Sequence, residues 1–227
     1  MKLLAIDAAT EACSVALMIG EEVTSRHEIA PRGHAQRLLP MVEEVLSEAG
    51  VSLSSLDAIA FDRGPGSFTG VRVGTSVTQG LAFGADLPVI PVSSLAAIAQ
   101  GVWQETGTTA IMAAIDARMK EIYWGLYIIE DGITQIQGIE HISRAEAVTL
   151  TKEQQWYGAG SGWLVYEETL LQLAPSGYTG FDGRRLPHAK DILSLAKASF
   201  SRQDYVSAEQ ALPCYLRNEV ARKQSGV

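Results

Sequence analysis

The feature that most constrains the fold is a short motif that occurs twice. The tetrapeptide Ala-Ile-Asp-Ala stands at residues 5–8 and again at 114–117, each time after an apolar stretch and before a further predicted strand. Residues 156–162 likewise repeat the order of a strand followed by a glycine-rich turn that occurs at 61–67. Because the same elements recur in the same order, we predict a duplicated structural unit.

The predicted elements describe strands followed by strand–helix units in each half. Apolar runs predict strands at about 3–8, 13–19, 23–29, 56–61, 87–92 and 122–127. Apolar residues at helical spacing predict helices over about 34–49, 71–84, 94–103 and 188–200. This order favours an α/β fold of two ribonuclease H-like lobes. A polar stretch at 104–109 separates a predicted N-terminal lobe, residues 1–106, from a C-terminal lobe, residues 107–227.

Two residues bear on where the first helix begins and ends. Pro40 lies inside the pattern, so that helix either starts late or bends there. Gly50 is expected to adopt the left-handed conformation that commonly ends a helix.

Composition narrows the classes of function. Hydrophobic residues make up 47% of the 227 residues and charged residues 19%, so the chain can bury a core. The net charge of −8 and the lack of clustered basic residues argue against tight, autonomous binding of nucleic acid. No apolar run reaches the roughly 18 residues of a membrane span, and the N-terminus does not match a signal peptide. Cys13 and Cys214 have no metal or redox spacing. We expect a cytoplasmic protein with no membrane contact.

The strongest local signal is the glycine-rich loop at 64–70, between a predicted strand and a predicted helix. Backbone N–H groups at a helix start can hold a phosphate, which makes Gly66 and Ser67 candidate nucleotide contacts. The loop lacks the Gly-Lys-Ser/Thr ending of a Walker loop. The alternative, which we favour on the loop alone, is a tight turn whose glycines serve packing.

Asp7 and Asp116 end equivalent strands, where magnesium and ATP could be held between lobes. Thr10 follows Asp7 in the first turn and is a further candidate anion contact, although such residues more often satisfy turn backbone. The turn after Asp116 reads Ala-Arg-Met-Lys at 117–120 instead of glycine-rich. Bulky side chains at this place count against a complete ATPase site.

A metal site or a catalytic nucleophile is not expected. The histidines at 27, 34, 141 and 188 are never three or four residues apart, the spacing of a helical metal pair. Cys13 lies in the middle of a predicted strand, where burial is usual.

Four segments, at 7–16, 63–72, 115–119 and 213–217, resemble the TsaB family, also called YeaZ. The resemblance covers nearly the whole chain, although Ala8 and Ala9 stand where Thr-Ala is usual. It implies an actin-like ATPase superfamily fold and a role in forming threonylcarbamoyladenosine at position 37 of tRNA. It also implies a complex with a TsaD-type catalytic paralogue and a TsaE-type ATPase. This complex would use the threonylcarbamoyl-adenylate made by TsaC.

The TsaD paralogues that resemble the same loop carry a His-x-x-x-His metal pair after it. Aligned without gaps, those histidines fall on Ser94 and Ile98 of this chain. The resemblance therefore implies a non-catalytic subunit that has no metal, no catalytic residue and no cofactor of its own. ATP or ADP is expected only at the border with partners, and tRNA only through the complex.

The partner surface is predicted on the helices at 34–49 and 71–84, because small residues let helices pack closely. The same surface could form a homodimer when the partner is absent. The alternative is that the glycines of the second helix pack inside their own lobe. The predicted interface residues are Leu38, Val42, Leu46, Val73, Gly74, Val77, Gly80 and Leu81.

Two other functions stay open from the residues. One is a stand-alone ATPase or small-molecule kinase with Asp7 and the glycine loop as its site. The other is a glycoprotease-like metallopeptidase, which would need ligands that the sequence does not show.

Overall fold

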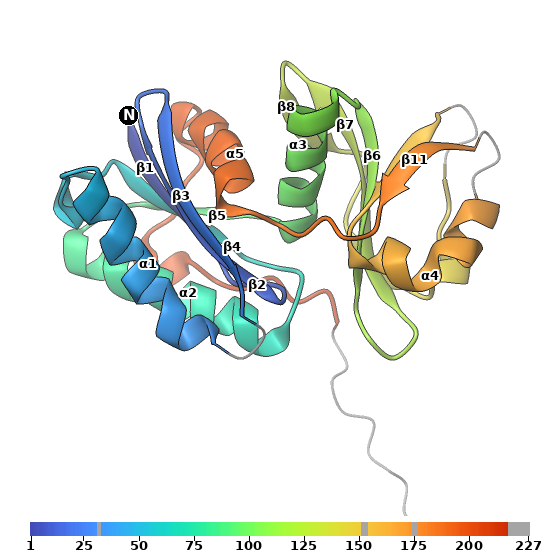
Figure 1. The fold of residues 1–227 in the computed structure, drawn as a ribbon, viewed down its shortest axis with the longest axis horizontal. Helices are drawn as coiled ribbons and strands as arrows, with labels where there is room; N and C mark the ends of the chain where they lie inside the picture. Colours follow the sequence, from blue (N-terminus) through green and yellow to red (C-terminus); the bar gives the residue numbers. More distant parts are fainter. Residues whose placement is uncertain (31–32, 151–153, 174–176, 218–227) are drawn as a thin grey trace, which may run out of the picture.

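The computed structural model describes residues 1–30, 33–150, 154–173 and 177–217. Two β-sheets stand side by side, each covered by helices, and they form two lobes (Figure 1). The predicted actin-like architecture of two ribonuclease H-like lobes is confirmed.

The first sheet has the strand order β3-β2-β1-β4-β5. Its strands are β1 (Lys2–Asp7), β2 (Ala12–Ile19), β3 (Glu22–Ile29), β4 (Ala58–Asp62) and β5 (Val89–Val92). The first three form an antiparallel meander, and β4 and β5 continue the sheet in parallel with β1.

The second sheet repeats this arrangement in the order β8-β7-β6-β10-β11, with the short β9 paired to β7. Its strands are β6 (Ala110–Asp116), β7 (Ile122–Glu130), β8 (Ile133–Ile136), β9 (His141–Ser143), β10 (Trp156–Ala159) and β11 (Tyr178–Asp182). Again the first three strands of the order are antiparallel and the next two are parallel to β6. The equivalent strand orders support the internal duplication that the repeated tetrapeptide predicts.

In the part of the chain that the structure describes, five helices cover the sheets. They are α1 (His34–Glu48), α2 (Phe68–Ala85), α3 (Ser94–Thr106), α4 (Ser161–Gln172) and α5 (Ala189–Ser201). Four were predicted to within three residues at each end, whereas α4 lies where the sequence shows no clear helical period. Three-residue 3₁₀ turns lie at Leu53–Ser55, Ala145–Ala147 and Ala208–Gln210 (η3).

The ends of α1 and α2 have local causes. The first helix starts at His34 and runs through Pro40, so the predicted late start is wrong. Gly50 has φ of +64°, the left-handed conformation expected after a helix. The second helix starts earlier than predicted because the Ser67 side chain accepts the Gly70 N–H at 3.3 Å.

Side chains of β1 alternate between two cores. Leu4 and Ile6 pack with α1 and α2, whereas Leu3 and Ala5 pack with α5 on the opposite face. The helix that follows the last strand of each half covers the other half's sheet: α3 packs on β6, β7 and β8, and α5 packs on β1, β2, β4 and β5 (Figure 1). The predicted division into residues 1–106 and 107–227 assigns each helix to a lobe by its position in the chain. The packing differs, because α3 lies on the second sheet and α5 on the first.

Candidate functional site

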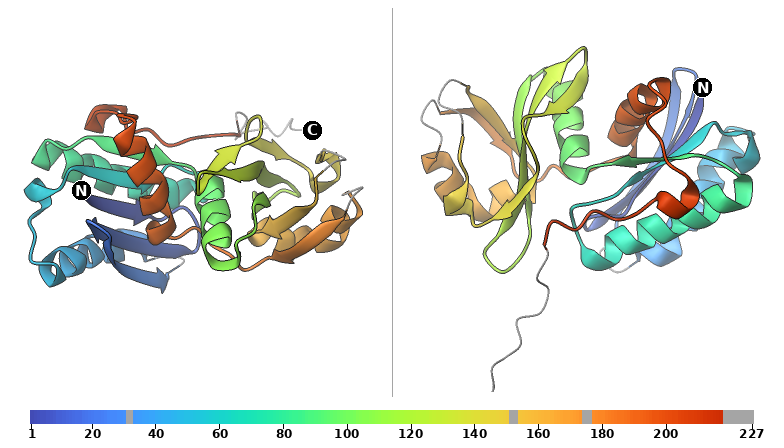
Figure 2. Two further views of the ribbon diagram at one scale, coloured as in Figure 1. Left: turned by 90° about the horizontal axis from the view of Figure 1, so that it is seen from above. Right: turned by 180° about the vertical axis from the view of Figure 1, so that it is seen from behind.

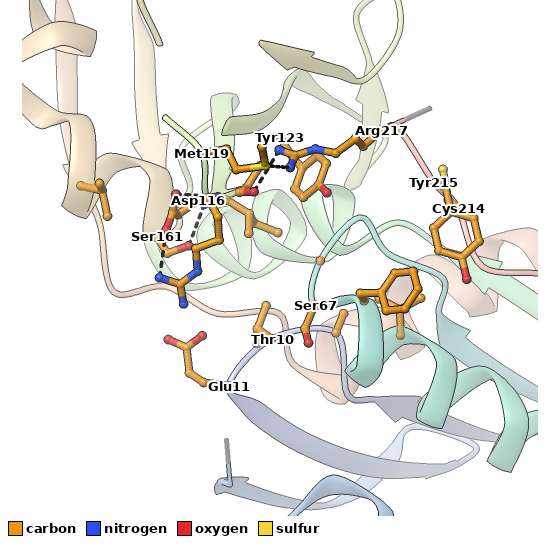
Figure 3. A pocket seen from close by; sticks show the side chains of 18 of the residues that line it. Thr10, Glu11, Ser67, Asp116, Met119, Tyr123, Ser161, Cys214, Tyr215 and Arg217 are labelled. Carbon is orange, nitrogen blue, oxygen red and sulfur yellow. Dashed lines mark hydrogen bonds and ion pairs between the residues drawn. The ribbon is translucent and has the colours of Figure 1, made fainter. Parts of the chain in front are cut away.

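A cavity of about 600 Å³ opens between the lobes (Figure 3). The first lobe contributes the β1–β2 turn and the start of α2, and the second contributes the β6–β7 turn and the start of α4. The C-terminal segment completes the wall. Its lining residues include Thr10, Glu11, Gly66, Ser67, Phe68, Asp116, Arg118, Met119, Ser161, Leu164, Val165, Tyr215 and Arg217.

The glycine-rich loop forms one edge of the cavity, and its glycines serve packing inside the first lobe. A Cβ added to Gly66 would lie 2.2 Å from the Ala9 carbonyl oxygen. One added to Gly70 would lie 2.1 Å from the Ala8 carbonyl oxygen. The Ser67 N–H also donates to Ala9 O at 2.7 Å. The close contacts explain these glycines without a ligand, in line with the packing alternative.

Thr10 and Ser67 lie next to each other at the floor of the cavity, as Figure 3 shows. The hydroxyl oxygen of Thr10 is nevertheless buried and has no hydrogen-bond partner among the described residues. It therefore reaches a ligand only after its side chain rotates. Ser67 is exposed, and its hydroxyl oxygen accepts the Gly70 N–H.

Asp7 does not line the cavity, although it was a candidate nucleotide contact. Its side chain is fully buried and accepts hydrogen bonds from Ser14 Oγ at 3.1 Å and from the Ala9 N–H at 3.0 Å. Burial, reinforced by the negative charge of Asp62, raises the pKa of Asp7 well above its usual range.

Asp62 is a buried neighbour of Asp7, and its negative charge adds to the effect of burial on the pKa of Asp7. Burial raises the pKa of Asp62 to about 6, opposed by hydrogen bonds from Ser94 Oγ at 2.5 Å and from the Gly64 N–H at 2.8 Å. The Oδ2 atom of Asp62 is buried and has no partner among the described residues, and the Asp62 carboxyl group interacts with that of Asp7. We infer that one proton is held between the two carboxyl groups, away from the cavity.

Asp116 does line the cavity, but an arginine neighbours its carboxylate. Its Oδ1 accepts the Arg118 N–H at 3.0 Å, and its Oδ2 lies 3.6 Å from the Arg118 guanidinium. Its own N–H donates to Ser161 Oγ at 3.1 Å. The bulky residues of this turn, Arg118, Met119 and Lys120, all have positive φ, between 55° and 65°.

The positions that align with the TsaD histidines face inward on the first turns of α3. Ser94 is fully buried and bonds to Asp62. Ile98 is fully buried in the apolar core between α3 and β6. These two positions are therefore part of the packed interior. Among the described residues, no group of three or more His, Cys, Asp or Glu side chains is arranged to hold a metal ion.

The predicted interface residues divide by burial. Leu38 and Val42 belong to the core under α1, so their prediction as partner contacts is wrong. Gly74 is buried too, and a Cβ there would lie 3.6 Å from the Ala8 Cβ. Of the other predicted residues, four are half-buried against the same core: Leu46, Val73, Val77 and Leu81.

Gly80 alone among the predicted residues is fully on the surface, with no atom within 4 Å of an added Cβ. Beside it Phe83 is 72% exposed. A shallow hollow lies between these two residues and η3. The outer side of α2 is therefore open at Gly80 and Phe83, near the helix C-terminus.

The sequence reasoning missed Asp62 and Arg217. Asp62 ends β4 as Asp7 ends β1, and adjacent parallel strands bring their carboxyl ends together, so this pair had a readable signal. Arg217 contacts residues about a hundred positions earlier in the chain, which no local pattern indicates.

Comparison with known proteins gives a consistent result. The family model described as "TsaD: tRNA N6-adenosine threonylcarbamoyltransferase" matches residues 18–182. The tRNA threonylcarbamoyladenosine biosynthesis protein TsaB of Escherichia coli is 45% identical over 99% of this chain and 98% of its own length. The protein of the same name from Haemophilus influenzae is 43% identical, covering 99% and 97%. The solved structure of YeaZ from Pseudomonas aeruginosa has a TM-score of 0.90 and 50% identity over 95% of this chain and 99% of that one.

The described part of the chain contains no helix that is long and apolar enough to cross a membrane.

Proposed function

The chain belongs to the TsaB family of tRNA threonylcarbamoyladenosine biosynthesis proteins, and we propose that it is a non-catalytic subunit that binds and activates a TsaD-type catalytic paralogue. The observation that carries the proposal is how the candidate catalytic positions are used. Ser94 and Ile98 are built into the core, and Asp7 is fully buried beside Asp62 and does not line the cavity. Asp116 faces Arg118. Residues used in these ways support the fold and leave the chemistry to a partner.

The outer side of α2 is the surface we propose for the partner. Gly80 leaves room for close approach of another helix, and the exposed ring of Phe83 offers an apolar anchor. The half-buried Val73 and Val77 add apolar area on the same helix. The same surface supports a homodimer when the chain is alone.

The remaining partners follow from the same proposal. A TsaE-type ATPase joins the complex, and ATP or ADP binds at the border between subunits. Gly66 and Ser67 are this chain's candidate contacts there, with Thr10 after a side-chain rotation. The net charge of −8 favours contact with tRNA through the complex and not by this chain alone. A role in tRNA modification favours a cytoplasmic location.

The test is size-exclusion chromatography with light scattering, on the chain alone and mixed with the TsaD-type paralogue of the same cell. We expect a homodimer that gives way to a one-to-one complex. The Gly80→Arg variant should weaken the complex. Its Kd should rise by at least about a hundredfold, a loss of about 2.7 kcal/mol in the free energy of binding. Its folded state should keep its Tm, because the added side chain meets open space and glycine disfavours a helix.

The matched control is Leu171→Asp, which changes an apolar side chain that is 42% exposed on α4 of the second lobe. It should leave the complex intact. If Gly80→Arg binds as tightly as the wild type, the α2 surface is not the interface. If the unmodified chain and the paralogue elute unchanged, the partner role fails. ATP turnover by the chain alone, lost with a folded Ser67→Ala variant, would then favour the ATPase alternative.

A further inference from the structure

The C-terminal segment, residues 206–217, runs along the first lobe and ends at the second (Figure 2). Val206 pairs with Val89 through two backbone hydrogen bonds of 2.8 Å. Further along, Gln79 Nε2 donates to the Ala211 carbonyl at 2.8 Å, and the Cys214 N–H donates to the Arg63 carbonyl at 2.7 Å. These contacts fix the segment on the first lobe along most of its length.

Tyr215 holds the segment at the mouth of the cavity. Arg72 Nε donates to its hydroxyl at 2.8 Å. The Arg72 guanidinium lies over the Phe68 ring, 3.4 Å from the ring centroid, and faces the Tyr215 ring at 5.4 Å. This cation–π stack positions the residues that follow Tyr215.

Arg217 then reaches across to the β6–β7 turn of the second lobe. Its Nη2 donates to the Ala117 carbonyl at 3.1 Å and to Glu121 Oε2 at 2.7 Å. Its Nη1 contacts the Met119 sulfur at 2.8 Å. The Arg217 side chain is only 20% exposed, so solvent screens the ion pair with Glu121 less than it would a fully exposed pair.

The turn that Arg217 holds is unfavourable by itself. Three consecutive non-glycine residues, at 118–120, are left-handed, and each costs about 1–2 kcal/mol relative to the right-handed conformation. Such conformations persist where surrounding contacts impose them. Arg217 supplies contacts of this kind from outside the turn, and they come from a segment anchored on the other lobe.

We propose that residues 206–217 act as a strap that fixes the β6–β7 turn relative to the first lobe and so sets the opening of the inter-lobe cavity. Arg217 is its positioning residue. The lobes are also joined by the packing of α3 against α5 and by chain crossings at Ser93 and at 183–188, but none of these lines the cavity, whereas Cys214, Tyr215 and Arg217 do. The strap also gives a role to the segment 213–217, to which no chemistry could be assigned from its sequence.

The test is amide hydrogen exchange and small-angle scattering on the full chain with Arg217→Ala. The Ala117 N–H bonds to Glu121 O at 2.9 Å and the Glu121 N–H to Arg118 O at 3.0 Å, so both amides report on the turn. We expect their exchange to speed up by at least about tenfold, with amides of β1 and β4 unchanged. The radius of gyration should increase because the lobes separate further.

A milder variant and a control keep the result interpretable. Glu121→Gln removes the ion pair while preserving shape, and it should reproduce the faster exchange at Ala117. In the double variant with Arg217→Ala and Glu121→Gln, these amides should exchange no faster than with Arg217→Ala alone, because both changes break the same interaction. The control, Arg202→Ala, alters an exposed arginine at the end of α5 and should change nothing. Unchanged exchange in Arg217→Ala, or a uniform rise through both lobes, overturns the strap.

Discussion

The two lobes have the same strand order, yet they use their equivalent aspartates differently. Asp7, at the end of β1, is fully buried and paired with Asp62. Asp116, at the end of β6, stands at the cavity wall beside Arg118. One carboxyl group is removed from the cavity by burial, and the other faces a cation of its own chain. Duplication has preserved the positions of both residues without preserving a shared chemical role.

The turns that follow these strands differ in what stabilises them. In the first lobe, the turn at 8–11 is locked by the glycines of α2, whose missing side chains let backbone touch backbone. In the second lobe, the turn at 117–121 keeps bulky left-handed residues and is held by Arg217 from outside. The first lobe's turn is thus fixed by its own packing and the second lobe's turn by the strap.

Replacing Gly70 with alanine is the strongest way to disturb the first of these arrangements. Because the new Cβ would lie 2.1 Å from the Ala8 carbonyl oxygen, we expect a loss of about 3 kcal/mol or more in the free energy of unfolding. In the second lobe, the new Cβ of Gly162→Ala would lie 2.9 Å from the Ala114 Cβ, a less severe overlap. We therefore expect a smaller loss in the free energy of unfolding. Urea denaturation of both variants gives the ranking.

The control for these variants is Gly80→Ala in the same helix as Gly70. Its Cβ meets nothing within 4 Å, so the better helix propensity of alanine should raise stability by up to about 1 kcal/mol. Equal losses for Gly70→Ala and Gly80→Ala would show that helix propensity, and not the contact with Ala8, determines the effect.

Asp7→Asn sharpens the contrast between the two aspartates. Burial raises the folded-state pKa of Asp7 well above its usual range and that of Asp62 to about 6, so the folded protein binds protons that the unfolded chain releases near pH 4. Stability should therefore fall as the pH rises from about 4 through 6 and beyond. Asparagine still donates to Asp62 but does not titrate.

The expected result is a flatter pH profile for Asp7→Asn. At pH 8 the variant should be more stable than the wild type by about 1–3 kcal/mol, and at pH 4 the two should be similar. Thermal unfolding across this pH range measures both curves. Parallel curves for variant and wild type would mean that the two carboxyl groups do not share a proton.

Lys120→Gly has the smallest expected effect and addresses the turn of the second lobe. Lys120 has φ of 65°, which glycine adopts without strain. The relief of strain is partly offset by the greater entropy of glycine in the unfolded chain, so we expect a gain of up to about 1 kcal/mol. Calorimetry detects the corresponding rise in Tm. A clear loss of stability would show that the lysine side chain itself supports the turn.

Much of the fold was predictable from sequence because its signals are local. The repeat of the tetrapeptide indicated the duplication, and helical periods located α1, α2, α3 and α5. The helix α4 was missed because two of its apolar residues, Leu164 and Val165, are exposed at the cavity and obscure the pattern. The exchange of α3 and α5 between sheets was not predictable, since periodicity shows that a helix has an apolar face but not which sheet covers it.

The site was less predictable than the fold. Thr10, Gly66 and Ser67 were predicted as candidate nucleotide contacts, and the structure brings all three to one cavity. The position of Asp7 away from the cavity, beside Asp62, depends on the pairing of β1 with β4. The burial of Leu38 and Val42 depends on the rotation of α1 about its axis where it packs on β2. Helical spacing identified the apolar side of α1, but that side faces the core and not a partner.

The reciprocal exchange of α3 and α5 also has a consequence for synthesis on the ribosome. The face of the first sheet that carries Leu3 and Ala5 is closed by Ile192 and Leu193, which are translated long afterwards. At about 5–20 residues per second, that apolar face waits roughly 10–40 seconds for its cover. The nascent chain therefore exposes this apolar face for most of its translation, and we expect a stop codon before α5 to yield an aggregation-prone fragment instead of a small folded lobe.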